Sequence, residues 1–572
     1  MARYAPDGRR IAFLRPADDD FERLDLWLHD LQTNRARCLV DARSLGDERQ
    51  LSEAEKARRE RLRVFAAGIV EFQWNRDGSA LLFPLAGRLY RLDPDDADAA
   101  PEPLTPEALF VTDVRVAASG AVGFVHEQNL WLLPSDAPES TPHPLTRDGG
   151  GTVGYGLPDF IAAEEMHRFD GYWFSPAGDR IAVLRVDESP IPSSVRQEID
   201  GDGFSLHEQR YPYAGGPNAR VDLGIIDLAD GDFRPLDWAA ADSEYLARVN
   251  WLTDGSGLLI QRQTRDQKRL DLVRLSLDGS PGKLILEEHS DTWINLADDL
   301  QLLADGRSAL WSSEREDVRR LYRLDLESGE LEPLTPADGM VQRLVSVDEP
   351  AGHAFVEGTF EHPTRRQLYR VDLGGSDAPV RLTDGTGCHA VRMAPDHAGF
   401  LDRHESLDRP PGLALRDAEG ELLADLVTND PARPDHPLHP YLDSRVRPEL
   451  GELEAEDGQR LCWRLTRPLE TAPGRRHPVI VSVYGGPGCS GSRTPSARSC
   501  TSTSPAAAGA CWNWTIAARP AAGAASSLPS TVAWAPPRWR TRSAASTCCG
   551  SWTGSIRTGS ASSATATAAT WR

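Results

Sequence analysis

Two adjacent carboxylates, Glu164 and Glu165, are the residues whose types and spacing most readily do chemistry in this sequence. They stand in the stretch DFIAAEEMHRFDGYWFSPAGDRIAVLRVDESPIP. Two carboxylates held together accept the N–H donors of an ammonium group by charge-assisted hydrogen bonds. Neighbours on a strand point to opposite faces, so we expect the pair on a helical turn or a loop. A solvated acidic pair is the alternative, and it is the usual state of such residues.

A second chemical candidate lies near residue 484, in the stretch HPVIVSVYGGPG. The continuous apolar run from residue 479 to residue 483 is typical of a strand buried on both faces. It leads into a Tyr-Gly-Gly-Pro turn that begins at Tyr484. In α/β domains the carboxyl end of such a strand is where working backbone and side chains gather.

The elements before this strand form a repeat. Each unit combines an alternating strand, a turn of the Pro-Asp-Gly type, an apolar strand and an aromatic-containing strand, as in YAPDGRRIAFLR followed by LDLWLHD. Asp-Gly turns supply the positive φ of tight hairpins, so each unit is one antiparallel sheet. Units begin near residues 4, 72, 114, 172, 249, 301, 345 and 391. About eight such sheets packed radially make a β-propeller; a string of β-sandwiches is the alternative.

Composition excludes several classes of function. The net charge of −23 argues against nucleic acid as a partner, because phosphate backbones require a basic face. No apolar run is long enough for a membrane span, and no signal region opens the sequence, so we expect a cytoplasmic protein. A periplasmic location is the alternative if the amino terminus is incomplete. The cysteines lack the spacing of a disulfide framework or a zinc site, and we expect no metal and no cofactor.

The propeller followed by PVIVSVYGGPG resembles the prolyl oligopeptidase clan of serine peptidases. The Glu-Glu stretch, together with EQRYPYAGGPNARVDLGII at residues 208–226, resembles its dipeptidyl peptidase IV branch. The resemblance implies that Glu164 and Glu165 bind the free N-terminal ammonium of a peptide substrate. It also implies that Tyr484 donates the hydroxyl of an oxyanion hole, which a tetrahedral intermediate requires. The intact relative would release N-terminal dipeptides with Pro or Ala at the second position. The sequence leaves the oligomeric state open.

The catalytic triad of such an enzyme is missing from the sequence as written. α/β-Hydrolases carry Ser inside G-x-S-x-G, followed by Asp and then His. No G-x-S-x-G occurs after Tyr484, and no Asp or His occurs after His477. We therefore expect a catalytically inactive chain. The alternative is a non-catalytic β-propeller that binds peptides or proteins.

The sequence also changes character near Gly488. Residues 489–572 contain no acidic residue and are rich in Ala, Ser, Thr and Arg. Either this is a genuine low-complexity segment, or it is a neighbouring reading frame. One permitted GC-rich coding of residues 555–571, read from its third base, gives DPDRIGVFGHSYGGYM, which contains G-x-S-x-G. The same offset from residue 514 permits DNRGSARRGR, which resembles the family's Asp-x-Arg-Gly strand end.

These observations predict a mostly β protein with three parts. Residues 1–435 form a β-propeller of about eight blades. Residues 436–488 form the truncated start of an α/β-hydrolase domain. Residues 489–572 form a frameshifted, poorly ordered tail, because such composition buries too little apolar surface to offset chain entropy.

Overall fold

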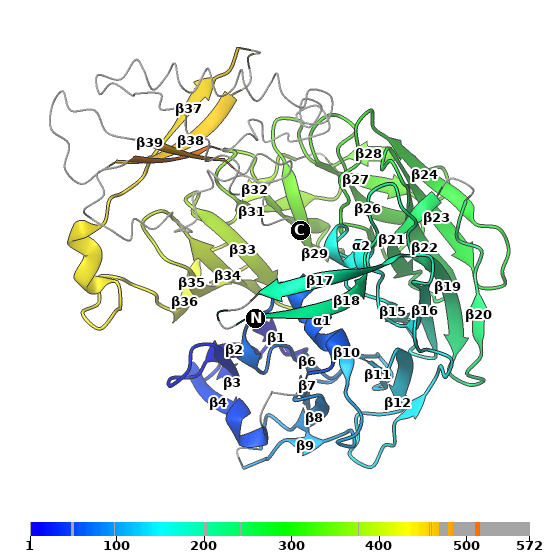
Figure 1. Ribbon diagram of the computed structural model, residues 1–572. Coiled ribbons are helices and arrows are strands. Elements are labelled where there is room, and N and C mark those ends of the chain that lie inside the picture. The colour runs from blue at the N-terminus through cyan, green and yellow to red at the C-terminus, as the bar shows by residue number, and fades with distance from the viewer. Residues whose placement is uncertain are drawn as a thin grey trace.

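Eight blades, each built on four antiparallel strands and two of them extended by a fifth strand, form most of the molecule. The computed structural model describes residues 2–46, 51–96, 98–199, 201, 203–240, 243–375, 377–456, 458, 460–467, 479–483 and 510–514. In Figure 1 the blades follow one another around a ring, from β1–β4 in blue to β33–β36 in yellow-green, which lies beside β1. The protein is thus a mostly β structure with an eight-bladed β-propeller, as the repeat predicts.

The first four blades contain both helices of the ring and the β17–β18 hairpin, and two of these blades have a fifth strand. Their strands, grouped by blade, are β1 (Ala2–Tyr4), β2 (Arg10–Pro16), β3 (Arg23–Asp30) and β4 (Arg35–Val40), with β5 (Ala67–Gly68) added to β3; β6 (Gln73–Trp74), β7 (Leu81–Leu85), β8 (Arg88–Leu92) and β9 (Glu102–Pro103); β10 (Thr112–Val116), β11 (Val122–His126), β12 (Asn129–Leu133) and β13 (His143–Pro144); and β14 (Val153–Tyr155), β15 (Tyr172–Phe174), β16 (Arg180–Asp187), β19 (Arg220–Asp227) and β20 (Phe233–Pro235).

The last four blades each consist of four strands without an inserted helix. Their strands, grouped by blade, are β21 (Ser243–Trp251), β22 (Gly257–Thr264), β23 (Arg269–Ser276) and β24 (Lys283–His289); β25 (Gln301–Leu302), β26 (Ser308–Ser313), β27 (Arg320–Asp325) and β28 (Leu331–Pro333); β29 (Val341–Asp348), β30 (His353–Gly358), β31 (Gln367–Asp372) and β32 (Val380–Arg381); and β33 (Cys388–Met393), β34 (Gly399–Glu405), β35 (Gly412–Asp417) and β36 (Leu422–Val427).

Local sequence explains the blades. Turn glycines between the first two strands take positive φ, for example +70° at Gly8 and +76° at Gly78, which is the conformation that the Asp-Gly signature supplies. Apolar residues of successive strands then fill the gaps between neighbouring blades. Leu184 of blade 4 and Leu258 of blade 5 lie in one such core, and both are fully buried. Each side chain of this size contributes about 1.5–3 kcal/mol on burial.

Three insertions depart from the regular blade. Helix α1 (Glu53–Leu62) and the short 3-10 turn η1 (Ala42–Leu45) connect blades 1 and 2. Helix α2 (Phe160–Glu164) interrupts the innermost strand of blade 4, between β14 and β15. A two-stranded hairpin, β17 (Ser193–Ile199) and β18 (Phe204–Arg210), follows β16 and crosses in front of the ring near α1 in Figure 1.

A separate sheet follows the propeller. After the 3-10 turn η2 (His439–Ser444), β37 (Glu449–Glu454) and β38 (Arg460–Thr466) form the hairpin that the sequence predicts. The predicted buried strand is β39 (Val479–Val483), and it pairs in parallel with β40 (Ala510–Trp514). β40 lies between β38 and β39, so the chain crosses over from β39 to reach it. This small sheet stands beside the ring in Figure 1.

We did not predict β40 from the sequence. It lies inside residues 489–572, where we expect little order, and its five residues are the part of that segment which the structure describes. Among the described helices, none is both long enough and apolar enough to cross a lipid bilayer.

Candidate functional site

The carboxylate pair lies on α2. Asp159 caps the helix by accepting a hydrogen bond from the Ala162 amide at 3.1 Å. The helix ends at Glu165, whose amide donates a hydrogen bond to the Ile161 carbonyl at 2.9 Å. Glu164 is therefore the last helical residue and Glu165 is the cap. The pair occupies a helical turn, as the adjacent carboxylates require, and the Glu165 side chain is exposed.

Two glycines bring the chain segments before and after α2 into contact at the base of this insertion. Gly156 and Gly171 face each other in an isolated antiparallel bridge. A Cβ atom at Gly171 would lie 2.3 Å from the Gly156 carbonyl carbon, so only glycine fits there. This contact returns the chain to the blade immediately after the helix. It thereby fixes where α2 leaves the propeller.

Helix α1 supplies the cationic side of the site. Ser52 caps it by accepting the Glu55 amide at 3.1 Å, and Arg63 ends it in the left-handed conformation with φ of 57°. The Arg63 guanidinium Nη2 lies 2.7 Å from Glu164 Oε1. The Arg63 side chain is 58% exposed and that of Glu164 is 17% exposed, so this ion pair sits at the solvent boundary.

A second arginine and an aromatic wall complete the surroundings. The Arg61 guanidinium lies over the Phe160 ring, 5.1 Å from its centroid, and burial lowers its pKa despite the nearby Glu188 and Glu164. The Phe160 ring meets Tyr211 edge-on at 5.3 Å. The aromatic wall formed by Phe160 and Tyr211 thus lies next to the carboxylates.

The stretches that carry the sequence resemblance meet at this end of blade 4. Glu188, which directly follows β16, donates its amide to the Thr152 carbonyl at 2.8 Å just before β14. Arg210 at the end of β18 donates a guanidinium hydrogen bond to the Ile191 carbonyl. Residues far apart in the sequence therefore surround α2. The remaining candidate, Tyr484, lies outside the described residues.

Sequence reasoning missed α1 and its arginines. Ser52 and Glu55 have the Ser-x-x-Glu spacing of a capping box, and the helix that follows is rich in Glu, Lys, Arg and Ala. That signal was available. Its weakness is that the helix has no apolar stripe, so periodicity does not reveal it.

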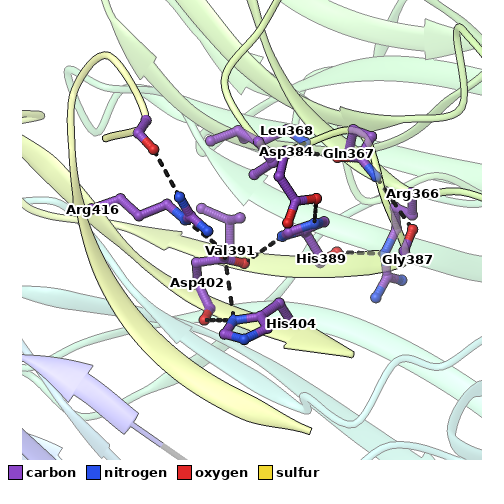
Figure 2. A network of polar contacts seen from close by, with 12 residues as sticks. Arg366, Gln367, Leu368, Asp384, Gly387, His389, Val391, Asp402, His404 and Arg416 are labelled. Carbon is purple, nitrogen blue, oxygen red and sulfur yellow. Dashed lines mark hydrogen bonds and ion pairs between the residues drawn. The ribbon is translucent and has the colours of Figure 1, made fainter. Parts of the chain in front are cut away.

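A second ionic cluster lies inside blade 8 and looks like catalytic chemistry at first sight. Figure 2 shows His389 between two carboxylates, with Nδ1 2.8 Å from Asp402 and Nε2 3.3 Å from Asp384. Arg416 Nε donates to Asp402 at 2.8 Å. Although burial alone would lower it, the hydrogen bonds to Asp384 and Asp402 raise the pKa of His389 to about 9. His389 is therefore a buried cation paired with acids, and it has no hydroxyl nucleophile among these partners.

The fold is an eight-bladed β-propeller with a short helix inserted in its fourth blade. The family model of the dipeptidyl peptidase IV (DPP IV) N-terminal region matches residues 88–411. The chain belongs to this family.

Named relatives agree with this assignment. A probable dipeptidyl-aminopeptidase B of Emericella nidulans is 27% identical over 401 residues, which cover 65% of this chain and 44% of the relative. Dipeptidyl peptidase 8 of Mus musculus is 22% identical over 538 residues, which cover 76% of this chain and 59% of the relative. The chain thus spans about half the length of the curated relatives it matches.

Solved structures show the same fold. The crystal structure of Porphyromonas gingivalis dipeptidyl peptidase 4 superposes with a TM-score of 0.73 at 19% identity, covering 90% of this chain and 71% of that chain. A dipeptidyl aminopeptidase IV homologue from Bacteroides ovatus gives a TM-score of 0.69 at 17% identity, covering 90% and 72%.

Proposed function

We propose that this chain binds peptides by their free amino terminus, as a dipeptidyl-peptidase-like protein, and that the chain as written does not cleave them. The observation that carries the proposal is the pair Glu164 and Glu165 on one helical turn, with Glu164 already holding a cation from Arg63 at 2.7 Å. A group that binds a guanidinium at the solvent boundary can bind an ammonium in its place.

The recognition chemistry follows from this arrangement. The peptide ammonium donates to the two carboxylates, and Arg63 then shares or releases Glu164. The backbone of the first two residues extends away from α2, so the carboxylates measure the distance to the second peptide bond. We propose Pro or Ala at the second position, in line with the family resemblance. Tyr484 would donate to the carbonyl oxygen of that bond.

Calorimetric titration with the tripeptide Ala-Pro-Ala tests the binding proposal. We expect Glu164→Gln and Glu165→Gln each to weaken binding about tenfold or more, because a hydrogen bond to a charged group contributes about 1.5–3 kcal/mol. Glu139→Gln, an exposed glutamate in blade 3, is the matched control and should bind as the native chain does. N-acetyl-Ala-Pro-Ala should bind the native chain no more tightly than free Ala-Pro-Ala binds a chain that carries both Glu164→Gln and Glu165→Gln. Equal binding of the acetylated and free peptides would overturn the proposal.

Absence of cleavage is a separate claim with its own test. Residues 485–572 contain neither G-x-S-x-G nor any Asp or His, so the chain lacks the residues that would activate a serine. We expect no hydrolysis of an Ala-Pro-linked chromogenic amide. Turnover that a serine-directed phosphonate blocks would contradict this expectation.

Nucleotide sequence across codon 488 distinguishes the origin of the segment. The frameshift proposal expects a single change of frame that restores DNRG and GHSYGG downstream. β40 ends at Trp514, the residue from which the shifted reading gives its Asp-x-Arg-Gly strand end, and this coincidence supports the proposal. An unambiguous frame through Arg572 would favour the alternative, a non-catalytic propeller that binds peptides or proteins.

A further inference from the structure

Asp113 stands out among the residues that the proposed function leaves unused. It lies on β10 with 2% of its surface exposed. Its φ of 50° is in the left-handed region, which a non-glycine residue rarely adopts, and the β10–β11 register is irregular between Thr112 and Arg115. The buried Tyr172 hydroxyl donates to the Asp113 carbonyl at 2.6 Å. The surrounding structure therefore holds an unfavourable backbone conformation in place, and that conformation directs the carboxylate inward.

Two arginines from different elements meet at this carboxylate. Arg115 makes a forked contact, with Nη2 2.9 Å from Oδ1 and Nε 3.2 Å from Oδ2. Arg58, from α1, places Nη2 3.6 Å from Oδ1 while it binds Glu71 with two hydrogen bonds of 3.2 and 2.8 Å. Asp113 is thus the point where α1 meets the inner strand of blade 3.

The contacts continue to both ends of α2. Arg115 Nη2 lies 2.5 Å from Asp170 Oδ1, shortly after the helix. The Asp170 carbonyl accepts Arg168 Nη1 at 2.6 Å. Arg168 Nη2 in turn lies 3.1 Å from Asp159, which caps the start of α2. This chain of polar contacts runs from α1 through Asp113 to the helix that carries Glu164.

Two ionic connections consequently join α1 and α2, and the Arg61–Phe160 contact adds a third. The outer connection is the Arg63–Glu164 pair, which is exposed and which a peptide ammonium would disrupt. The inner connection is the series through Asp113, whose side chain is 2% exposed, and it reaches solvent at Asp170, which is 42% exposed. When the outer pair opens, the inner series and the Arg61–Phe160 contact still set the distance between the two helices.

We propose that Asp113 is a positioning residue of the ammonium site, which keeps Glu164 and the arginines of α1 in register while a peptide is bound. The inference rests on the proposed function, because it assigns Asp113 a role in that site. Asp113 acts through Glu164 and does not touch the peptide. Its effect on binding must therefore depend on Glu164 being present.

A double-mutant cycle on Ala-Pro-Ala affinity tests this dependence. We expect Asp113→Asn to weaken binding about tenfold in the native background, within the usual range of coupling between sites. In the Glu164→Gln background the same change should alter affinity less than about twofold, since effects through one group do not add. Equal effects in both backgrounds would overturn the proposal.

A buried carboxylate elsewhere provides the matched control for simple destabilisation. Asp299 is 4% exposed, accepts Ser312 Oγ at 2.7 Å, and lies just before blade 6. We expect Asp299→Asn to lower the melting temperature without changing peptide affinity per folded molecule. If Asp113→Asn folds poorly, Arg115→Lys replaces it, because lysine keeps the charge but cannot fork between Asp113 and Asp170.

Amide hydrogen exchange separates failure of this inference from failure of the proposed function. In the absence of any peptide, we expect Asp113→Asn to speed exchange in residues 53–62 and 160–168, whereas Asp299→Asn does not. If the native chain binds no tripeptide but Asp113→Asn still speeds exchange in these two segments, only the proposed function is refuted. Unchanged exchange in both segments would overturn the positioning role.

Discussion

Blades 4 and 8 both hold acids and bases in close contact, but they use them differently. In blade 8 the His389 and Asp402 side chains are 1% and 0% exposed and pair with each other, and Asp384, which is 41% exposed, pairs with His389 from the solvent side. At blade 4 Arg63 is 58% exposed and Glu165 projects into solvent. Burial therefore distinguishes an ionic cluster whose central groups are shielded from water from one whose groups are open to solvent.

The largest expected effect comes from breaking the buried ionic cluster of blade 8. Asp402→Asn leaves His389 and Arg416 buried without their shared counter-charge, which costs about 3–5 kcal/mol of unfolding free energy. Urea unfolding measures it, with Glu419→Gln on the exposed β35–β36 turn as the control. Peptide affinity should stay unchanged in the folded protein. If Asp402→Asn weakened peptide binding as much as a Glu164 variant does, the two blades would not differ in role.

A rise in pH tests the stabilising role of the blade 8 cluster without a mutation, because it removes the charge of His389. The pKa of His389 is about 9 in the folded protein and about 6.5 in the unfolded chain. Because folding raises this pKa, the stability that protonated His389 contributes is complete below pH 6.5 and is lost as the pH rises through 9. The difference corresponds to about 3 kcal/mol.

Urea unfolding at pH 7 and pH 10 measures this contribution. His389→Gln is the control and should show a much smaller decline over the same interval. A native chain as stable at pH 10 as at pH 7 would contradict the charged state assigned to His389.

Gly171→Ala tests how the chain positions the solvent-exposed cluster of Arg63, Glu164 and Glu165. The new Cβ would meet backbone at 2.3 Å, so the base of the α2 insertion must shift, at a cost of about 1–3 kcal/mol. We expect lower stability together with weaker tripeptide binding. Gly154→Ala, whose nearest neighbour would lie at 3.8 Å, is the matched control and should be neutral. Normal affinity in Gly171→Ala would show that the Gly156–Gly171 contact does not position the carboxylates.

The smallest expected effect is on α1. Ser52→Ala removes the hydrogen bond to the Glu55 amide and costs about 1 kcal/mol. Amide exchange in residues 53–62 should become several-fold faster, with little change in the unfolding of the blades. Ser189→Ala, at an exposed serine, serves as the control. If α1 exchanges at the native rate, tertiary contacts alone fix the helix.

The contrast between the blades also explains what the sequence could predict. Turn glycines such as Gly8 and Gly78 repeat with the strands, so local patterns predict eight sheets. The adjacency of Glu164 and Glu165 also predicts a helical turn or a loop, and the structure has a helical turn there. Asp113 and Arg58 lie far apart in the sequence, and no local pattern shows that they meet. β40 escaped prediction because its neighbours in sequence lack the composition of a folded domain.

The seam of the ring has a mechanical consequence. Blade 1 is built from β1–β4 and blade 8 from β33–β36, and neither sheet borrows a strand from the other. Tyr4 and Ile11 instead pack against Ala394 and Leu401 across the join. Among the described residues, a separation of the ring at this join would therefore break no interstrand hydrogen bond of a shared sheet. The cohesion of the first and last blades thus depends on how well these side chains pack together.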